Sequence, residues 1–267
     1  MEPRVTFIIA HHNYEQYLEG CVKSALNQTY KNIHVCIIDD CSDGEDESII
    51  GDTPLSMVMD KIMPEDTIES IETLENMQII KSSKITFIKL RKDKGSYQQA
   101  FARNRGMEAC WDNTDIFAIL DADDENYPTK IEKCVQILQR YPKEVGAVYT
   151  DTNIINVDTN RLVREYREPF DNFRLINECI VHSGCVISKY ALEHVLENGL
   201  VFDEDMPPCE DYDLWIRIAE KFLIYHIPEP LVLVRVHTQN STNTTTHEHR
   251  MSRLQKIHQK RQSRQQA

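Results

Sequence analysis

The chain has 267 residues, of which 41% are hydrophobic, and a formal net charge of −13 at pH 7. This length suits one α/β domain or two small ones, and the negative charge argues against nucleic-acid partners, which need a cationic surface. The sequence contains no run of about 18 apolar residues, so we expect no membrane-spanning helix. The apolar stretch near the start is too short for a secretory signal. The eight cysteines include no C-x-x-C pair, so we expect a reducing, cytoplasmic location.

Five short apolar stretches rich in β-branched residues predict strands. They lie at residues 5–10, 34–39, 85–90, 116–121 and 145–150. Apolar residues at helical spacing follow the first stretch and recur after Pro128, a residue suited to the first helical position. Strands that alternate with helices predict βαβ units. We therefore expect an α/β fold with a mostly parallel central sheet flanked by helices.

An acidic segment interrupts the alternation. Residues 43–75 contain eleven Asp or Glu and a single Lys. We interpret 43–84 as an insertion on the rim of the sheet. Its apolar residues permit one or two short helices; they are Ile62, Ile68, Ile71 and Leu74.

The second half of the chain has a less regular pattern. It predicts a strand around 182–188, a helix over 210–222 and a strand over 231–237, followed by a polar linker over 238–249. The tail, 247–267, holds six Lys or Arg and one Glu, and residues 250–264 predict a basic helix. A charge asymmetry of this kind is typical of a solvated face or a partner contact. We expect the tail to contact an anionic partner or a membrane surface.

The segment "IFAILDADDENYP", residues 116–128, is the most informative part of the chain. A buried strand ends in Asp121, Asp123 and Asp124, at the edge where open α/β sheets bind ligands. Carboxylates crowded in this way repel one another unless a cation lies among them. A divalent ion held by one or two carboxylates and substrate phosphates is the simplest such cation. The competing interpretation is an acidic turn that caps the helix beginning near Pro128.

Five segments in order resemble the motifs of the family 2 glycosyltransferases. They are the opening "VTFIIAHHNYEQYLEGCVKSALNQTYKNIHVCIIDDCSDG", then "AFARNRGMEAC", "LDADDENYP", "CEDYDLWIRIAEKF" and "PLVLVRVHTQNST". The resemblance implies the fold called GT-A, a Rossmann-like nucleotide-binding sheet joined to a smaller acceptor-side region. It implies a glycosyltransferase domain over 1–246, with a nucleotide-sugar-binding half at 1–125 and an acceptor-binding half at 126–246.

The resemblance also assigns the donor site. The nucleotide base is placed at Ala10, His11 and His12, with Asp40 accepting the imide N–H of the base. Asp121 faces the ribose, Ala122 follows it in the donor site, and Asp123 binds a divalent metal, Mn²⁺ or Mg²⁺, between the two phosphates. His237 matches a histidine that contacts the metal or the diphosphate. Arg103 is a further candidate for a phosphate contact. An ionised carboxylate accepts an N–H from uracil or guanine, and we expect a UDP-sugar donor.

On the acceptor side, the resemblance makes Asp211 the general base. An ionised Asp can take the proton of an attacking hydroxyl, although a residue that opens a helix is also an ordinary N-cap candidate. Glu210 and the loop with His182 and Ser183 are placed at a glycan or other hydroxyl-bearing acceptor.

The chain departs from the family pattern in two places. Ala10-His11-His12 replaces Pro-Thr-Tyr, so an imidazole stands where an aromatic ring stacks on the base. No Q-x-x-R-W motif of the processive members follows Asp211, which favours transfer of one sugar per encounter. The leading interpretation is an inverting, metal-dependent glycosyltransferase. The alternatives are a nucleotidyltransferase, whose Gly-rich phosphate loop is absent, and a non-catalytic nucleotide-sugar-binding scaffold.

Overall fold

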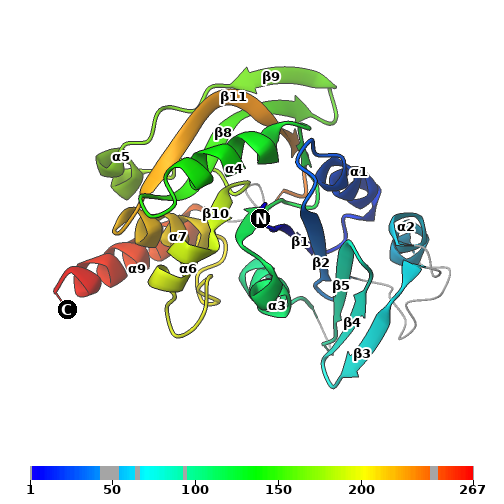
Figure 1. The fold of residues 1–267 in the computed structure, drawn as a ribbon. Helices are drawn as coiled ribbons and strands as arrows, with labels where there is room; N and C mark the ends of the chain where they lie inside the picture. Colours follow the sequence, from blue (N-terminus) through cyan, green and yellow to red (C-terminus); the bar gives the residue numbers. More distant parts are fainter. Residues whose placement is uncertain (1, 43–53, 64–66, 93–94, 241–245, 267) are drawn as a thin grey trace.

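A computed structural model describes residues 2–42, 54–63, 67–92, 95–240 and 246–266. In this part of the chain, eleven strands form one sheet with helices packed on its two faces (Figure 1). The path of neighbouring strands runs β3-β4-β5-β2-β1-β6-β10-β8-β11-β7, and β9 pairs with β8. None of the helices described is both long and apolar enough to cross a membrane.

The centre of the sheet is parallel, as the alternating pattern predicts. The neighbours are paired as β5-β2-β1-β6, and their bounds are β1 Val5–His11, β2 Ile33–Asp39, β5 Ile85–Leu90 and β6 Ile116–Ile119. Two helices connect these strands, α1 Glu15–Leu26 and α3 Gln99–Cys110, the second followed by the 3₁₀ turn Trp111–Asn113. Consecutive residues of β1 alternate between two apolar clusters, with Phe7 and Ile9 in one and Ile8 in the other. This alternation follows from the two-residue period of a strand and explains why both faces need helices.

Antiparallel strands extend the parallel centre on both sides, so the whole sheet is mixed. Beyond β6 lie strands from the second half: β7 Glu125–Asn126, β8 Val145–Asn156, β9 Arg161–Glu165, β10 Val186–Ser188 and β11 Leu223–Val236. β10 is antiparallel to both β6 and β8, whereas β11 is parallel to β8. The predicted α/β fold is confirmed, and parallel pairs occur both in the centre of the sheet and between β11 and β8.

The acidic insertion contains a helix and a hairpin rather than two helices. Helix α2 covers Pro54–Ile62, and β3 Ser70–Leu74 pairs with β4 Met77–Lys81, which continues the sheet from β5. The expectation of helix around Ile71 and Leu74 was wrong because a two-residue turn closes the hairpin after Leu74, and both side chains are exposed. Residues 43–53 and 64–66 of the insertion lie outside the described part.

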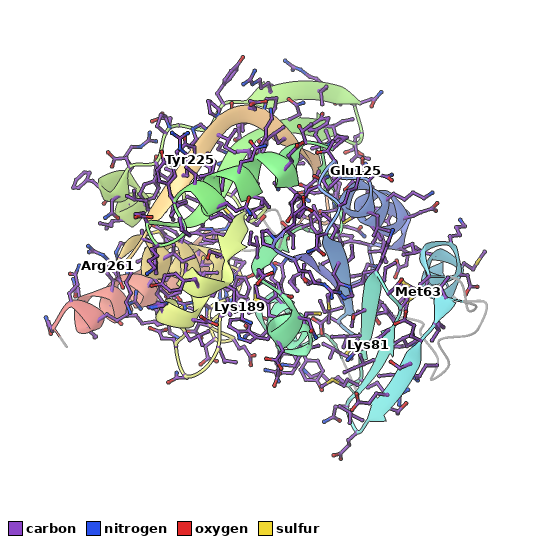
Figure 2. All side chains as sticks on the ribbon, in the orientation of Figure 1. Met63, Lys81, Glu125, Lys189, Tyr225 and Arg261 are labelled. Carbon is purple, nitrogen blue, oxygen red and sulfur yellow. The ribbon has the colours of Figure 1, made fainter. Side chains whose placement is uncertain are left out.

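Four helices of the second half complete the covering of the sheet. Their bounds are α4 Lys130–Arg140, α5 Asn172–Asn177, α6 Lys189–Val195 and α7 Glu210–Ala219. Side chains fill the space between these helices and the strands (Figure 2). The fully buried Trp215 of α7 belongs to the same apolar cluster as Ile8 of β1. The two halves of the sequence therefore share one core.

The basic tail forms the predicted helix, α9, over His247–Gln266. Ile257 of α9 is fully buried. Lys260 donates to Asp203 at 2.7 Å and also pairs with Glu197 at 2.5 Å, and Arg264 pairs with Glu220. Part of the positive charge of the tail is thus neutralised within the chain, and its contact with an outside partner stays a prediction. Residues 241–245 of the polar linker lie outside the described part.

The glycine of the "ARNRG" segment has a packing role that yields a test. A Cβ atom on Gly106 of α3 would lie 2.4 Å from Cδ1 and 2.9 Å from Cγ1 of Ile38, which is buried in β2. Gly→Ala in a helix normally gains about 1 kcal/mol, but overpacking here costs about 1–3 kcal/mol. We predict that Gly106→Ala lowers the free energy of unfolding, measured by urea denaturation.

The double variant Gly106→Ala/Ile38→Ala is the control, because it removes the clashing atoms. Its loss of stability should be smaller than the sum of the two single losses by about 1 kcal/mol or more. Strict additivity would contradict the packing explanation.

Candidate active site

Three parallel strands end at the same edge of the sheet and bring the predicted donor residues together. His11 at the end of β1 is in register with Asp39 at the end of β2, and β6 runs beside β1. Asp121 and Asp123 directly follow β6. Open α/β sheets bind ligands at this edge, and the predicted donor residues His11, Asp121 and Asp123 lie there.

Asp121 is the centre of a hydrogen-bond network that joins three segments. Its Oδ1 accepts from Nη2 of Arg103 at 2.6 Å and from Nε2 of Gln99 at 3.1 Å, and both donors lie on α3. Its Oδ2 accepts from the hydroxyl of Ser183 at 2.5 Å, in the loop before β10. The half-buried carboxylate is therefore held in one orientation by α3 and by the loop before β10.

Asp123 and His237 face each other although they are far apart in sequence. Nε2 of His237 lies 3.0 Å from Oδ2 of Asp123, and the side-chain amide of Asn240 donates to the same oxygen at 2.9 Å. The ring of Tyr17 stacks on His237 with 5.2 Å between centroids. Burial, and next the charge of Asp121, raise the pKa of Asp123. A cation at this position would relieve both effects.

Arg235 fixes the backbone around this pair. Its Nη1 donates to the carbonyl oxygen of Asp123 at 2.8 Å, and Nη2 contacts Glu125 at 2.5 Å. The backbone N–H of Arg235 donates to Asp124 at 2.9 Å. Burial holds the pKa of Asp124 well above its usual range. Asp124 is thus a structural member of the acidic turn.

The Asp123–His237 pair fits a divalent metal with only two protein ligands. Carboxylate oxygen and imidazole nitrogen are both donors that Mn²⁺ accepts, and Mg²⁺ prefers oxygen. Within the described ranges, no group of three or more His, Cys, Asp or Glu is placed to hold a metal ion. An ion at this pair would therefore complete its coordination with substrate phosphates and water, which is the usual arrangement for a phosphate-bound Mg²⁺.

The predicted base lies at the start of α7, close to the donor network. Nη1 of Arg103 donates to Oε1 of Glu210 at 3.1 Å, so a single guanidinium joins Asp121 to the first residue of α7. Oδ1 of Asp211 accepts the backbone N–H of Tyr212 at 2.7 Å. Burial, and next the charge of Glu210, raise the pKa of Asp211 to about 7. A carboxylate with this pKa is well matched to general-base catalysis near neutral pH.

The turn after β1 uses most of its polar groups internally. Nε2 of the buried His11 accepts the backbone N–H of Tyr14 at 3.2 Å, and its Nδ1 contacts Asp39 at 3.3 Å. His12 donates from Nδ1 to the backbone oxygen of Asp40 at 2.9 Å and is only half-buried, like Ala10. The buried His11 thus stabilises the turn through its hydrogen bonds, and the partly accessible residues of the turn include Ala10 and His12.

Asp40 anchors the segment that leads into α3. Its two carboxylate oxygens accept the backbone N–H groups of Tyr97 and Gln98, both at 2.7 Å. Burial raises the pKa of Asp40 in spite of these bonds. The predicted contacts of Ala10, His11, His12 and Asp40 with a base stay predictions.

The loop before β10 is held by a buried lysine. Nζ of Lys130 donates to the carbonyl oxygen of Gly184 at 2.7 Å and to Oδ1 of Asn126 at 2.9 Å. Nδ1 of His182 accepts the N–H of Gly184 at 2.9 Å, and burial holds the pKa of His182 well below its usual range. His182 and Ser183 therefore shape the loop from within, and their predicted contact with an acceptor stays a prediction.

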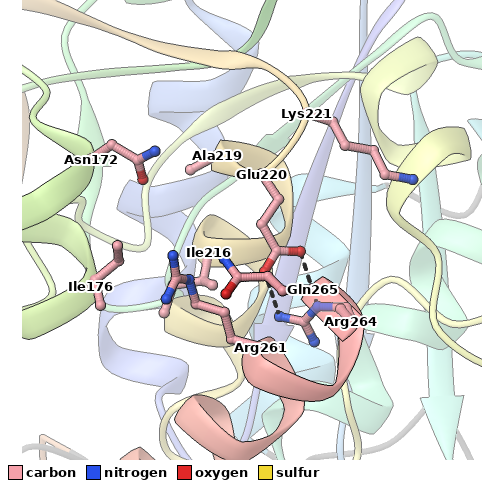
Figure 3. Close-up of a pocket in the computed structure, with 9 residues that line it drawn as sticks. All are labelled: Asn172, Ile176, Ile216, Ala219, Glu220, Lys221, Arg261, Arg264 and Gln265. Atoms are coloured by element: carbon pink, nitrogen blue, oxygen red, sulfur yellow. Dashed lines mark hydrogen bonds and ion pairs between the residues drawn. The ribbon is translucent and has the colours of Figure 1, made fainter. Parts of the chain in front are cut away.

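A separate cavity of about 570 Å³ lies between α5, α7 and α9 (Figure 3). The carboxylate of Glu220 and the guanidinium of Arg264 form an ion pair in its wall. Arg261 of the tail helix also lines it. None of the predicted donor, base or metal residues borders this cavity, so it is not the candidate active site.

Two family profiles match the sequence. "Glycosyl transferase family 2" covers residues 6–53, and "Glycosyltransferase like family 2" covers residues 47–256. The chain belongs to glycosyltransferase family 2. The resemblance drawn from the five motifs is thereby confirmed.

The sequence is also similar to proteins that are described as glycosyltransferases or as a synthase. An uncharacterized glycosyltransferase of Haemophilus influenzae is 24% identical over 92% of this chain and 69% of its own length. One from Rickettsia prowazekii is 28% identical over 91% of this chain and 67% of its own length. Chondroitin synthase of Pasteurella multocida is 25% identical over 84% of this chain but only 20% of its own length.

Solved structures confirm the GT-A fold. S. aureus TarS, residues 1–349, in complex with UDP-GlcNAc superposes with a TM-score of 0.68 at 12% identity, over 95% of this chain and 65% of that one. The same protein in complex with UDP gives 0.61 at 13% identity, over 88% and 61%. The chain thus spans less than two thirds of these neighbours, and at such identities the likeness concerns the fold.

Sequence reasoning missed several residues that hold the family motifs in place. Gln99 donates to Asp121, and Asn240 donates to Asp123. Tyr17 stacks on His237. Lys130 follows Pro128 in a helical pattern and shows no local sign of binding Gly184, which lies 54 residues away. The one available signal was the segment "RVHTQN", since polar residues after a strand often face a ligand edge.

We predict that Lys130→Met destabilises the protein by at least about 1 kcal/mol, because it leaves two buried acceptors without a donor. Burial lowers the pKa of Lys130 to about 8. Above that pH the lysine is deprotonated in the folded protein but still protonated in the unfolded chain. The unfolded state therefore binds more protons, and this group makes the wild-type protein more stable as the pH rises toward about 10. Urea denaturation at pH 7 and pH 9.5 should show a larger deficit of the variant at the higher pH.

Lys133→Met is the matched control. Lys133 lies on the same helix in an exposed ion pair with Glu229, so its loss should cost less than about 0.5 kcal/mol. Equal stability of the two variants would show that the Lys130 contacts do not hold the loop.

Proposed function

We propose that the chain transfers one sugar from a UDP-sugar to an acceptor hydroxyl with inversion at the anomeric carbon. One observation carries the proposal. Arg103 joins Asp121 of the acidic turn to Glu210, the residue before Asp211, so the donor motif and the predicted base belong to one site. The family membership favours sugar transfer over the nucleotidyltransferase alternative.

The donor half supports a uridine nucleotide. The TarS structures are described as complexes with UDP and UDP-GlcNAc, and the chain shares their fold. Asp40 already accepts two backbone N–H groups, but a carboxylate offers about four acceptor positions, so it can still accept the imide N–H of uracil. The half-buried imidazole of His12 would provide a small face for stacking against the base.

Asp123 and His237 would hold a divalent ion beside the donor diphosphate. When bound, such an ion offsets the negative charge that develops on the leaving group. Asp123 stays in position because Asn240 and Arg235 bind its side chain and its backbone. Asp121 is oriented by Arg103, Gln99 and Ser183 and would accept from a ribose hydroxyl.

Asp211 would perform the proton transfer. The acceptor oxygen attacks the anomeric carbon while its proton passes to the carboxylate, and the bond between that carbon and the diphosphate oxygen breaks. A single displacement of this kind inverts the configuration. We place the acceptor between Asp211 and the loop of His182 and Ser183, which Lys130 keeps in a fixed shape. Glu210, also predicted at the acceptor, lies next to Asp211 in the sequence and forms an ion pair with Arg103.

We predict that activity needs a divalent ion and that Asp123→Asn weakens its binding. Chelation with EDTA should abolish sugar transfer, and Mn²⁺ should restore it. The affinity for Mn²⁺ in the presence of UDP is measured from the free Mn²⁺ signal in electron paramagnetic resonance. It should fall at least about tenfold, because loss of a direct ligand should cost at least as much as loss of an outer-shell partner. The exposed Asp158→Asn is the control. Full activity after chelation would refute the metal requirement.

We predict that Asp211→Asn lowers kcat by at least about a hundredfold, in line with typical general-base contributions. Binding of UDP-GlcNAc, measured by calorimetry, should stay within about twofold because the residue acts on the acceptor. Asp205→Asn, an exposed residue before α7, should keep wild-type activity. If Asp211→Asn reduced binding as strongly as turnover, the residue would instead be a structural cap of α7.

A further inference from the structure

Arg103 occupies an unusual place for a residue expected to bind phosphate. Only 2% of it is exposed, in the middle of α3. Nη2 donates to Asp121 at 2.6 Å and Nη1 to Glu210 at 3.1 Å. The guanidinium carbon also lies 5.4 Å from the ring centroid of Phe202. Both terminal nitrogens are thus already bound by carboxylates of this chain.

The surroundings of Asp211 make this arginine electrostatically important. Burial first, then the charge of the neighbouring Glu210 and, to a smaller extent, that of Asp121 raise the pKa of Asp211, whereas Arg103 lowers it. Three thiols also lie near Asp211: those of Cys209 before α7, Cys179 after α5 and Cys185 before β10. Burial raises the pKa of each thiol, and the charge of Asp211 adds to this rise. The positive charge of Arg103 favours the ionised forms of the three acidic side chains around it, Asp121, Glu210 and Asp211.

Glu210 transmits the contact to the base. Its Oε1 receives Nη1 of Arg103, while its Oε2 is buried and has no hydrogen-bond partner among the described residues. Glu210 and Asp211 are the first two residues of α7. The contact that holds Glu210 therefore also fixes the N-terminus of the helix, where Asp211 lies. The same guanidinium fixes Asp121, which faces the donor in the proposed function.

We propose that Arg103 is a positioning residue that keeps Asp211 in its charged, proton-accepting form and aligns it with the donor through Asp121. This inference rests on the proposed function for its catalytic consequence. It differs from the expectation that Arg103 reaches the donor phosphates. A phosphate contact would affect donor affinity, whereas a positioning role affects the titration of Asp211 and the turnover.

The sign of the effect follows from the charges. A nearby positive charge favours an ionised carboxylate and lowers its pKa by about 1–3 units. Without Arg103, Asp211 holds its proton to a higher pH. Since the base works only when deprotonated, the acidic limb of the pH profile of kcat moves to higher pH.

The test compares Arg103→Gln with Arg105→Gln, a residue of the same helix that pairs with the exposed Glu108. For Arg103→Gln we expect the midpoint of the acidic limb to rise by about one pH unit or more, with the KM for UDP-GlcNAc within about twofold. Arg105→Gln should match the wild type. A raised KM with an unmoved acidic limb would overturn the proposal and assign Arg103 to the phosphates.

A second readout does not need sugar transfer. The carboxyl carbons of ¹³C-labelled aspartate are titrated by NMR, and Asp211→Asn identifies the resonance of Asp211. Its midpoint should rise in Arg103→Gln and stay in Arg105→Gln. If the wild-type protein transferred no sugar, the proposed function would fail, yet this titration would still decide the role of Arg103.

Arg103→Lys guards against loss of folding, because it keeps the charge but has one ammonium group in place of two separate nitrogens. A smaller rise in the midpoint of Asp211 supports the proposal. An unchanged midpoint in both Arg103 variants contradicts it.

Discussion

The site depends on the compensation of carboxylates that the fold forces together. Asp121, Glu210 and Asp211 come from two distant motifs, and burying them without a partner would cost several kcal/mol per charge. Arg103 lies between the two motifs with both terminal nitrogens engaged. A second compensation, by His237, Asn240 and Arg235, stabilises the acidic turn from the other side. Both halves of the chain must be folded for either set of contacts to exist.

The mixed sheet provides the frame for this arrangement. Its parallel centre brings the carboxyl ends of β1, β2 and β6 to one edge because neighbouring strands run in the same direction. The long strand β11 lies between β8 and β7, parallel to the first and antiparallel to the second. The short β7 immediately follows the acidic turn. This pairing carries Arg235 and His237 back to residues more than a hundred positions earlier. The tail helix α9 lies against α7, so its ion pairs support the helix that carries the proposed base.

Periodicity and motif spacing predicted the parallel strands, the acidic turn at the end of β6 and the helix with Asp211, because each is encoded within about ten neighbouring residues. The hairpin β3–β4 was missed because Ile71 and Leu74 are spaced as they would be in a helix, and only pairing with β4 decides between the two. The burial of His11 and the partners of Arg103 were also beyond the sequence. Arg103 and Glu210 are 107 residues apart, and no local pattern encodes their contact.

The most direct test of the account is the release of nucleoside diphosphate from a panel of UDP-, GDP- and CDP-sugars in the presence of Mn²⁺, with water as the acceptor where no other is supplied. The account predicts slow release of UDP from at least one UDP-sugar, and loss of that release in Asp211→Asn. Release that is equal in the wild type and Asp211→Asn, or a preference for a CDP-sugar, would contradict it.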